Sequence, residues 1–90
     1  MASFKYTGTF KRDFKRLEND AAAMAQLDQA MRALDRLEPL PASFHDHKLV
    51  GSLTRCRECH LRPNLLLLYE IAGNIVILHR LGTHAELFRR

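Results

Sequence analysis

Residues 64–81, NLLLLYEIAGNIVILHRL, decide the fold because they contain two apolar segments separated by a tight-turn signal. Residues 64–71 are a nearly continuous apolar run, which is typical of a central strand of a sheet. Residues 73–74 are Gly-Asn, a favourable two-residue hairpin turn, and residues 75–81 follow as the returning strand. The preceding residues 54–61 alternate well enough to form a further strand. The second half of the chain is therefore predicted to be an antiparallel sheet.

The start of the chain predicts a short strand followed by a helix. Phe4 and Tyr6 alternate with a lysine, which is a brief strand pattern. Thr9 can cap the N-terminus of the helix that follows. The apolar face of this helix is marked by residues at i, i+4 and i+7, which are Phe10, Phe14 and Leu17.

A second helix is predicted where apolar residues step by three and four positions, at Met24, Leu27, Met31 and Leu34. Asn19 and Asp20 end the first helix and can cap the second. Asp28 and Arg32 form an exposed i,i+4 pair, and the prolines at positions 39 and 41 end the helix. Two helices joined this closely form a helical hairpin, and its apolar stripe is expected to be core.

Together these elements predict the α+β class, with an N-terminal strand and a helical hairpin packed on a small antiparallel β-sheet. The 90 residues have room for a single domain, residues 1–90, and for no second core. Residues 40–52, LPASFHDHKLVGS, form a loop that is too long and too polar to be a tight turn, as functional loops often are. The tail, residues 83–90, is expected to be a last short strand or a turn of helix.

Positive charge and histidine are concentrated in the second half of the chain. The formal net charge is +4 and the sequence pI is about 9.5. Residues 1–42 carry seven basic and six acidic side chains, whereas residues 43–90 carry seven basic and four acidic side chains and all five histidines. This distribution indicates a surface that binds a polyanion.

The N-terminal residues do not resemble an export signal, because charges interrupt their apolar residues every few positions. The longest apolar stretch, near residue 65, is far too short to cross a membrane. We therefore expect a cytoplasmic protein without a membrane partner.

Residues 56–60, Cys-Arg-Glu-Cys-His, spell the CxxCH signature of c-type haem attachment. Haem attachment takes place outside the cytoplasm, and in a strand Cys56 and Cys59 would point to opposite faces of the sheet. The same geometry weakens the alternative of a zinc site, for which one CxxC is only half a ligand set. We expect two reduced thiols, with no haem, no metal and no cofactor.

Strand alternation places a carboxylate, an imidazole and a guanidinium on one face, at Glu58, His60 and Arg62, together with Cys56. Burying these groups in a core would be costly, so this face is expected to border solvent, a ligand or a cleft. The second half of the chain can bring five such groups to one region: His47, Glu58, His60, Arg80 and His84.

Such a set suits cleavage of RNA without a metal ion. The 2′-hydroxyl needs a base, the leaving 5′-oxygen needs an acid, and the developing phosphorane charge needs a fixed cation. An aromatic ring beside these groups, such as Phe88, can stack an unpaired base.

Three segments resemble a known family in order and spacing. Residues 46–52, DHKLVGS, resemble the DHxLxGS stretch of YafQ-like toxins, and residues 59–69, CHLRPNLLLLY, resemble their H-x-x-P-D-x-x-L-x-Y strand pair. Residues 80–88, RLGTHAELF, resemble the R-x-G-[ST]-H-x-x-L-F tail. The opening residues Tyr6, Phe10, Lys11 and Asp13 also fit the usual start, in which an aromatic strand leads to an F-K-[KR]-D helix. The chain is thus identified as a member of the YafQ-like branch of the RelE toxins.

This resemblance implies a RelE-like, microbial-ribonuclease-like fold and the toxin role of a type II toxin–antitoxin system. Such toxins cut mRNA, commonly on the translating ribosome, and a cognate antitoxin protein holds them inactive. The resemblance implies active-site imidazoles at His47, His60 and His84, a phosphate-stabilising Arg80, a base-positioning Phe88 and a strand carboxylate at Glu58. Contacts to the RNA backbone are expected from Lys48, Arg55, Arg57 and Arg62.

One position departs from the family pattern. Asn64 stands where these toxins often carry an aspartate, and Leu65 replaces an aromatic residue found in some of them. An amide cannot accept a proton at neutral pH, so a general-base role at position 64 is lost. Either a histidine supplies the base, or the chain is a weak or inactive relative that mainly binds its antitoxin or nucleic acid.

Overall fold

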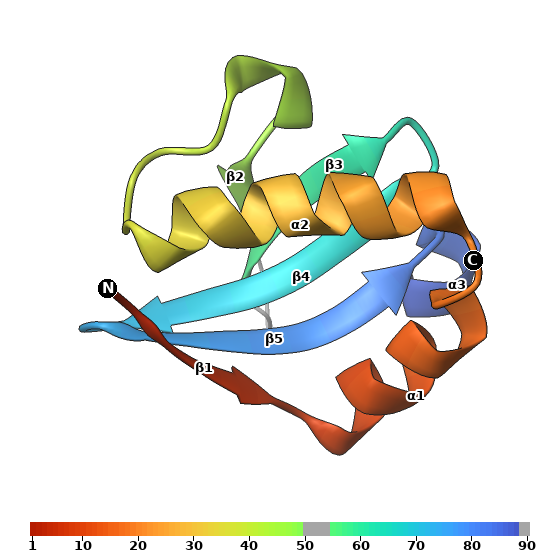
Figure 1. Ribbon diagram of the computed structural model, residues 1–90, viewed down its shortest axis with the longest axis horizontal. Coiled ribbons are helices and arrows are strands. Elements are labelled where there is room, and N and C mark those ends of the chain that lie inside the picture. The colour runs from red at the N-terminus through yellow and green to blue at the C-terminus, as the bar shows by residue number, and fades with distance from the viewer. Residues whose placement is uncertain (50–54, 89–90) are drawn as a thin grey trace.

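The computed structural model describes residues 1–49 and 55–88, which form an α+β fold (Figure 1). Its elements, in chain order, are β1 (Ser3–Tyr6), α1 (Gly8–Leu17), α2 (Ala21–Asp35), the 3-10 helix η1 (Ala42–Phe44), β2 (His47–Lys48), β3 (Arg57–Arg62), β4 (Leu65–Ala72), β5 (Ile75–Gly82) and α3 (His84–Phe88). The predicted class is confirmed. Among the described residues, no helix has the length and apolar character needed to cross a membrane.

The five strands form one mixed sheet in the order β1-β5-β4-β3-β2. The predicted antiparallel arrangement holds for β2 to β5, and β4 and β5 are joined by the predicted turn, where Gly73 has a φ of 63°. The sheet is mixed because β1 joins its edge parallel to β5, with Ser3 opposite Ile75. This pairing links the two ends of the chain, so no local pattern could predict it.

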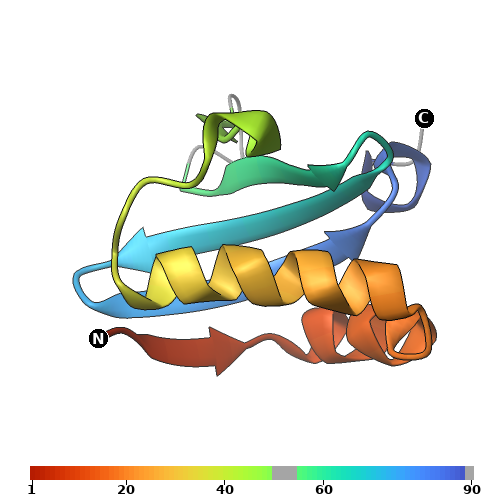
Figure 2. The same cartoon turned by 45° about the horizontal axis from the view of Figure 1, so that its top comes forward.

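Helix α2 covers one face of the sheet (Figures 1 and 2). Its buried stripe is Ala23, Leu27, Ala30 and Leu34, which packs with Leu65, Leu67 and Tyr69 of β4 in the main core. Two of the four predicted stripe residues, Leu27 and Leu34, belong to it. The other two, Met24 and Met31, pack at its margin because the alanines take the central positions nearest the sheet.

The helix caps differ from prediction at one position. Thr7, and not Thr9, caps α1: its Oγ1 accepts a hydrogen bond from the Phe10 N–H at 3.0 Å and donates one to the His79 carbonyl at 2.9 Å. The prediction was wrong by two residues because the bond to β5 selects Thr7. Asp20 caps α2 as predicted, accepting from the Ala23 N–H at 3.0 Å.

Strand and tail boundaries also become defined. The strand predicted at residues 54–61 is observed as β3, Arg57–Arg62, and Thr54 lies outside the described residues. The tail forms the short helix α3, in which Thr83 and Glu86 cap one another through backbone N–H groups at 2.8 and 3.2 Å. The long loop contains η1 and β2, and Val50, Gly51 and Ser52 of the DHxLxGS-like stretch lie outside the described residues.

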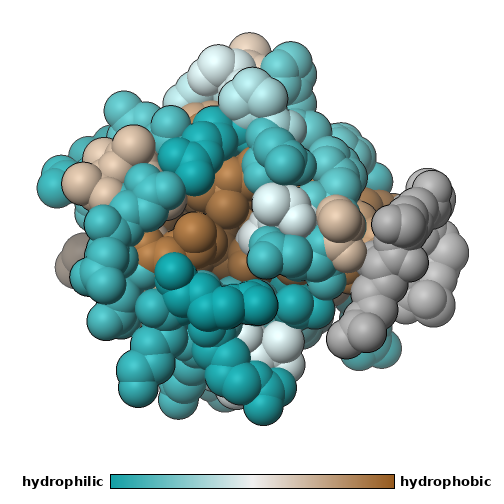
Figure 3. Space-filling model, turned by 90° about the vertical axis from the view of Figure 1, so that its right-hand side faces the viewer, coloured by the Kyte–Doolittle hydropathy of each residue, from teal (hydrophilic) through white to brown (hydrophobic). Residues whose placement is uncertain are grey.

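One side of the molecule combines polar and apolar surface. On the side where α1 and α3 lie, hydrophilic side chains surround a hydrophobic hollow (Figure 3). Apolar residues therefore reach the surface there between hydrophilic ones.

Candidate active site

A buried carboxylate lies at the centre of a histidine cluster. Oε1 of Glu58 is 3.0 Å from Nε2 of His60, 3.6 Å from Nε2 of His47 and 4.0 Å from Nε2 of His84. The Glu58 side chain is only 7% exposed, whereas those of His47 and His84 are each 52% exposed. One inaccessible carboxylate thus contacts or approaches three imidazoles that a ligand can reach.

Three elements assemble this cluster. Glu58 and His60 are two residues apart on β3 and therefore point to the same face. The pairing of β2 with β3 sets His47 directly opposite Glu58, and α3 begins at His84. A Cβ at Gly82 would lie 2.7 Å from Oε1 of Glu86, so the glycine leaves room for this oxygen to accept the hydrogen bond from the Thr83 N–H.

The rings of the cluster pack around His60. His60 lies edge-on to His84 with ring centroids 5.6 Å apart, and His84 is followed by Phe88 at 6.1 Å. The His47 Nδ1 lies 2.9 Å from the His45 carbonyl, while its Nε2 faces Glu58. A neutral His47 ring can donate to only one of these two acceptors.

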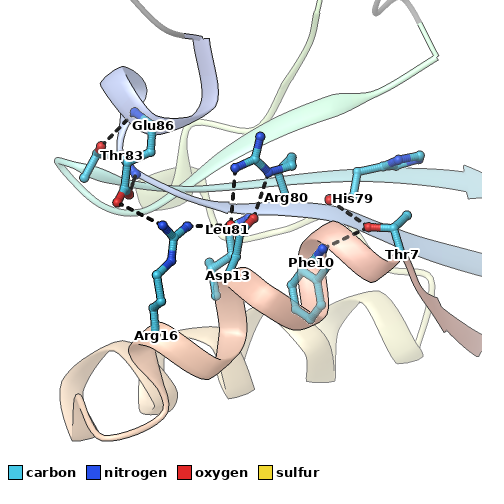
Figure 4. Close-up of polar contacts among 9 residues, drawn as sticks. All are labelled: Thr7, Phe10, Asp13, Arg16, His79, Arg80, Leu81, Thr83 and Glu86. Atoms are coloured by element: carbon cyan, nitrogen blue, oxygen red, sulfur yellow. Dashed lines mark hydrogen bonds and ion pairs between the residues drawn. The ribbon is translucent and has the colours of Figure 1, made fainter.

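Arg80 lies at the edge of this region, in a second polar network (Figure 4). Its Nε and Nη2 donate to the two carboxylate oxygens of Asp13 at 2.8 and 3.2 Å. The Asp13 carboxylate also accepts from the Leu81 N–H at 2.9 Å and from Arg16 at 2.7 Å, although its side chain is 2% exposed. Strand β1 pairs with β5 only as far as Leu78, and beyond that point the Asp13 side chain of α1 accepts the hydrogen bond from the Leu81 N–H of β5.

The network perturbs the pKa values of both main partners. Burial opposes ionisation of Asp13, but hydrogen bonds from Arg80 and Leu81 and the charges of Arg80 and Arg16 outweigh it, so the pKa of Asp13 lies below its usual value. The hydrogen bonding of Arg80 to the Asp13 carboxylate, in which the guanidinium is the donor, is the main reason why the pKa of Arg80 is raised. Both groups are therefore charged at neutral pH, and Arg80 is held as a fixed cation.

Comparison with known proteins identifies the family to which this geometry belongs. The profile described as "Bacterial toxin of type II toxin-antitoxin system, YafQ" matches residues 2–89. The chain belongs to the YafQ family. The mRNA interferase toxin YafQ of Escherichia coli (strain K12) is 34% identical over 85 residues, which are 93% of this chain and 92% of that protein.

Solved structures agree along the whole chain. The crystal structure of YafQ from E. coli strain BL21(DE3) has a TM-score of 0.88 and 31% identity, covering 98% of this chain and 99% of that one. A copper-bound mutant toxin from Helicobacter pylori has a TM-score of 0.90 and 35% identity, covering 98% and 100%. YafQ in the E. coli DinJ–YafQ complex has a TM-score of 0.86 and 32% identity, covering 98% and 99%.

Of the residues expected at the site, the structure brings His47, Glu58, His60, His84 and Phe88 of this YafQ-family chain into one cluster. Arg80 lies two strands from Glu58, since both residues are opposite Leu68 of the intervening strand β4. Asn64 is exposed in the turn between β3 and β4 and is not among the contacts of the cluster.

The cations expected to bind RNA differ in availability. Lys48 and Arg55 are exposed. Arg57 donates to both carboxylate oxygens of Asp46, and Arg62 pairs with Asp20 at 2.9 Å. Strand alternation predicted that Arg62 shares a face with Glu58 and His60. The pairing of β3 with β4 shifts register between His60 and Arg62, so the regular alternation does not extend to Arg62.

Sequence reasoning missed three residues that shape the site: Asp13, His45 and Asp46. Asp46 accepts hydrogen bonds from Arg57 and from the Tyr69 hydroxyl, and so ties the loop that carries His45 and His47 to β3 and β4. The Asp-His pair at positions 46–47, which opens the DHKLVGS stretch, could have drawn attention to Asp46. His45 has a left-handed conformation with a φ of 49°, and its ring lies 5.9 Å from that of His60.

The two cysteines are buried and free, and His60 of the CxxCH stretch faces Glu58. Burial is the main reason why the pKa of Cys59 is raised to about 12 and why that of Cys56 is also raised. A possible set of metal ligands lies in the histidine cluster instead. Glu58, His60 and His84 each offer one ligand atom, and these three atoms lie within 4.8 Å of one another, a spacing that can hold a metal ion.

Proposed function

We propose that this chain is the toxin of a type II toxin–antitoxin system, an endoribonuclease that cleaves mRNA without a metal ion by attack of the 2′-hydroxyl. The observation that supports it most is the approach of three imidazoles to the single buried carboxylate oxygen of Glu58. The related E. coli protein is named an mRNA interferase. Imidazoles titrate near neutral pH, which suits them to move protons in both directions.

In this mechanism Glu58 orients His60, and His60 removes the proton from the 2′-hydroxyl. The 2′-oxygen then forms a bond to phosphorus while the bond from phosphorus to the 5′-oxygen breaks. The more exposed His47 and His84 bind the phosphate and donate a proton to the leaving 5′-oxygen. Arg80, fixed by Asp13, stabilises the charge of the phosphorane, and Phe88 stacks on a base. The products are a 2′,3′-cyclic phosphate and a free 5′-hydroxyl.

The test is the chemistry of the product ends. Purified toxin is incubated with mRNA on translating ribosomes in Mg²⁺ buffer and, separately, with free mRNA in EDTA. Both reactions are expected to leave 2′,3′-cyclic phosphate or 3′-phosphate ends, with a slower rate on free mRNA. The conservative variant Glu58→Gln, which keeps the size of the side chain but loses its charge, should cleave at least ten-fold more slowly. Products with 5′-phosphate ends that disappear with EDTA would overturn the mechanism.

Antitoxin binding and ribosome dependence are parts of the same proposal. A solved relative is a complex of YafQ with DinJ, and a corresponding antitoxin is expected to bind this chain and block its cleavage. Comparing cleavage of one mRNA with and without ribosomes tests ribosome dependence. Adding the product of the neighbouring gene tests inhibition. An mRNA cut equally fast without ribosomes would contradict the ribosome step alone.

A second function is favoured by the ligand geometry of the same cluster. Glu58, His60 and His84 present a carboxylate and two imidazoles at metal-ligand spacing, and one H. pylori relative is described as copper-bound. We propose that a transition-metal ion binds here and inhibits cleavage, because it would occupy the nitrogens that must carry protons. Protein freed of metal should cleave fully, added Cu²⁺ should inhibit it, and EDTA should restore the activity. Stimulation by Cu²⁺ would contradict this proposal.

A further inference from the structure

A cleft of about 600 Å³ lies between α1 and β5, on the side of Arg80. The residues that line it are polar and mostly basic: Thr9, Arg12, Asp13, Lys15, Arg16 and Arg80. It holds four positive charges and one negative charge, and that negative charge is the buried Asp13 carboxylate already bonded to Arg80, Arg16 and Leu81. The cleft is therefore positive where a ligand can reach it.

Two of the lining cations are available for a ligand. Arg12 and Lys15 are exposed, and within residues 1–49 and 55–88 no carboxylate lies within 4.0 Å of either. The side chain of Arg16 is 59% exposed, although it bonds to Asp13. By contrast, Arg57 and Arg62, which the sequence suggested for RNA contacts, are paired with Asp46 and Asp20.

Arg80 and α3 connect the lining of the cleft with the candidate active site. Arg80 lines the cleft and lies two strands from Glu58, which corresponds to about 10 Å at the usual strand spacing. Helix α3 reaches both places, since His84 belongs to the cluster and Glu86 approaches Arg16 at 4.0 Å (Figure 4). An RNA strand carries one negative charge per nucleotide and spans this separation within a few nucleotides.

We propose that this cleft binds the backbone phosphates of the RNA next to the scissile one, so that Arg12, Lys15 and Arg16 extend the active site along α1. The inference rests on the proposed ribonuclease function. An RNA backbone fits the lining better than a protein segment does, because the cleft offers guanidinium and ammonium donors and no apolar side chain. The centres of protein interfaces are instead rich in aromatic and other apolar residues.

The experiment measures binding of a 2′-O-methyl RNA oligonucleotide, which the toxin cannot cleave, by fluorescence anisotropy over a range of KCl concentrations. The double variant Arg12→Ala/Lys15→Ala should bind more weakly. The slope of log affinity against log salt should fall by roughly 0.7 for each phosphate that the variant no longer neutralises. On cleavable mRNA, KM should rise while kcat stays nearly unchanged.

Lys11→Ala is the matched control. It removes one positive charge from the same helix, against two in the double variant, and Lys11 lines a different hollow, with Tyr6, Phe10 and Phe14. A double variant whose salt slope equals that of Lys11→Ala overturns the proposal. So does a double variant that keeps its oligonucleotide affinity but loses antitoxin affinity, because the cleft would then be a protein-binding surface.

The outcome is separable from that of the proposed ribonuclease function. Glu58→Gln should slow cleavage at least ten-fold while leaving oligonucleotide binding and its salt slope intact. If the unaltered chain binds the oligonucleotide through Arg12 and Lys15 but cleaves no mRNA, the cleft assignment stands and the ribonuclease proposal fails. The melting temperatures of both α1 variants should match that of the unaltered chain, since the substituted side chains are exposed.

Discussion

Removal of the Asp13 carboxylate is expected to destabilise the fold more than almost any other single polar substitution in this chain. The carboxylate is 2% exposed and accepts hydrogen bonds from Arg80, Arg16 and the Leu81 N–H. In Asp13→Ala the Leu81 N–H loses its acceptor and Arg80 loses its counter-charge. Breaking a buried pair from one side typically costs about 3–5 kcal/mol.

That loss is large for a domain of this size. At roughly 0.05–0.15 kcal/mol per residue, a chain of this length has about 5–13 kcal/mol of stability in total. Since ~1 kcal/mol shifts the melting temperature of a small domain by about 4–8 °C, Asp13→Ala should melt at least ~12 °C lower. Asp13→Asn keeps an oxygen for the Leu81 N–H but loses the charge and the second acceptor oxygen, because its amide nitrogen would face the guanidinium donors. Its cost should still be smaller than that of Asp13→Ala, about 1.5–3 kcal/mol.

Urea unfolding followed by circular dichroism measures these costs. Asp28→Ala serves as the control, because it removes a carboxylate from an exposed i,i+4 pair with Arg32 and should cost no more than ~0.5 kcal/mol. If Asp13→Ala and Asp28→Ala had equal unfolding free energies, the argument that the Asp13 network stabilises the fold would be refuted.

The pH dependence gives a second measure of the same network. The pKa of Asp13 is lowered in the folded state, because bonds and charges from Arg80, Leu81 and Arg16 outweigh the opposing effect of burial. Its contribution is therefore complete above the unfolded pKa of about 3.9 and is lost as the pH falls through the lower folded pKa. The stability difference between the unaltered chain and Asp13→Asn should be constant from pH 7 to about pH 5 and shrink below pH 4. A difference that shrinks on raising the pH would contradict this sign.

Three further outcomes are expected. Arg80→Lys should keep the positive charge beside Asp13 but lose the bidentate guanidinium. The loss of one charge-assisted hydrogen bond should lower kcat/KM for cleavage about ten-fold to a hundred-fold. An unchanged kcat/KM would show that Arg80 has no part in the mechanism. Asn64→Asp should raise the cleavage rate about ten-fold to a thousand-fold on the same mRNA with ribosomes, and equal rates would show that position 64 is not catalytic. Cys59 is fully buried and its pKa is raised to about 12. Its thiol should therefore react with iodoacetamide only after the protein is unfolded in urea, and rapid labelling of the native protein would contradict its burial.

Local patterns in the sequence were sufficient for the elements that they contain. The hairpin of β4 and β5 follows from two apolar runs around Gly73-Asn74, and the α2 cap follows from Asp20. The facing of Glu58 and His60 follows from strand alternation alone. Such features depend on residues a few positions apart, whose geometry the backbone repeat sets.

Only the tertiary structure decided the features that join distant segments. Nothing near Asp13 in the sequence indicates that its carboxylate meets Arg80, 67 residues later, or that β1 pairs in parallel with β5. Glu58 looked like part of an exposed ridge, yet residues from β2 and α3 converge on it and leave it 7% exposed. Local periodicity states which face of an element is apolar, whereas the partner of a polar group depends on how the whole chain packs. The sequence by itself therefore determined the α+β elements and the chemistry available to this protein, and packing decided which carboxylate holds which cation.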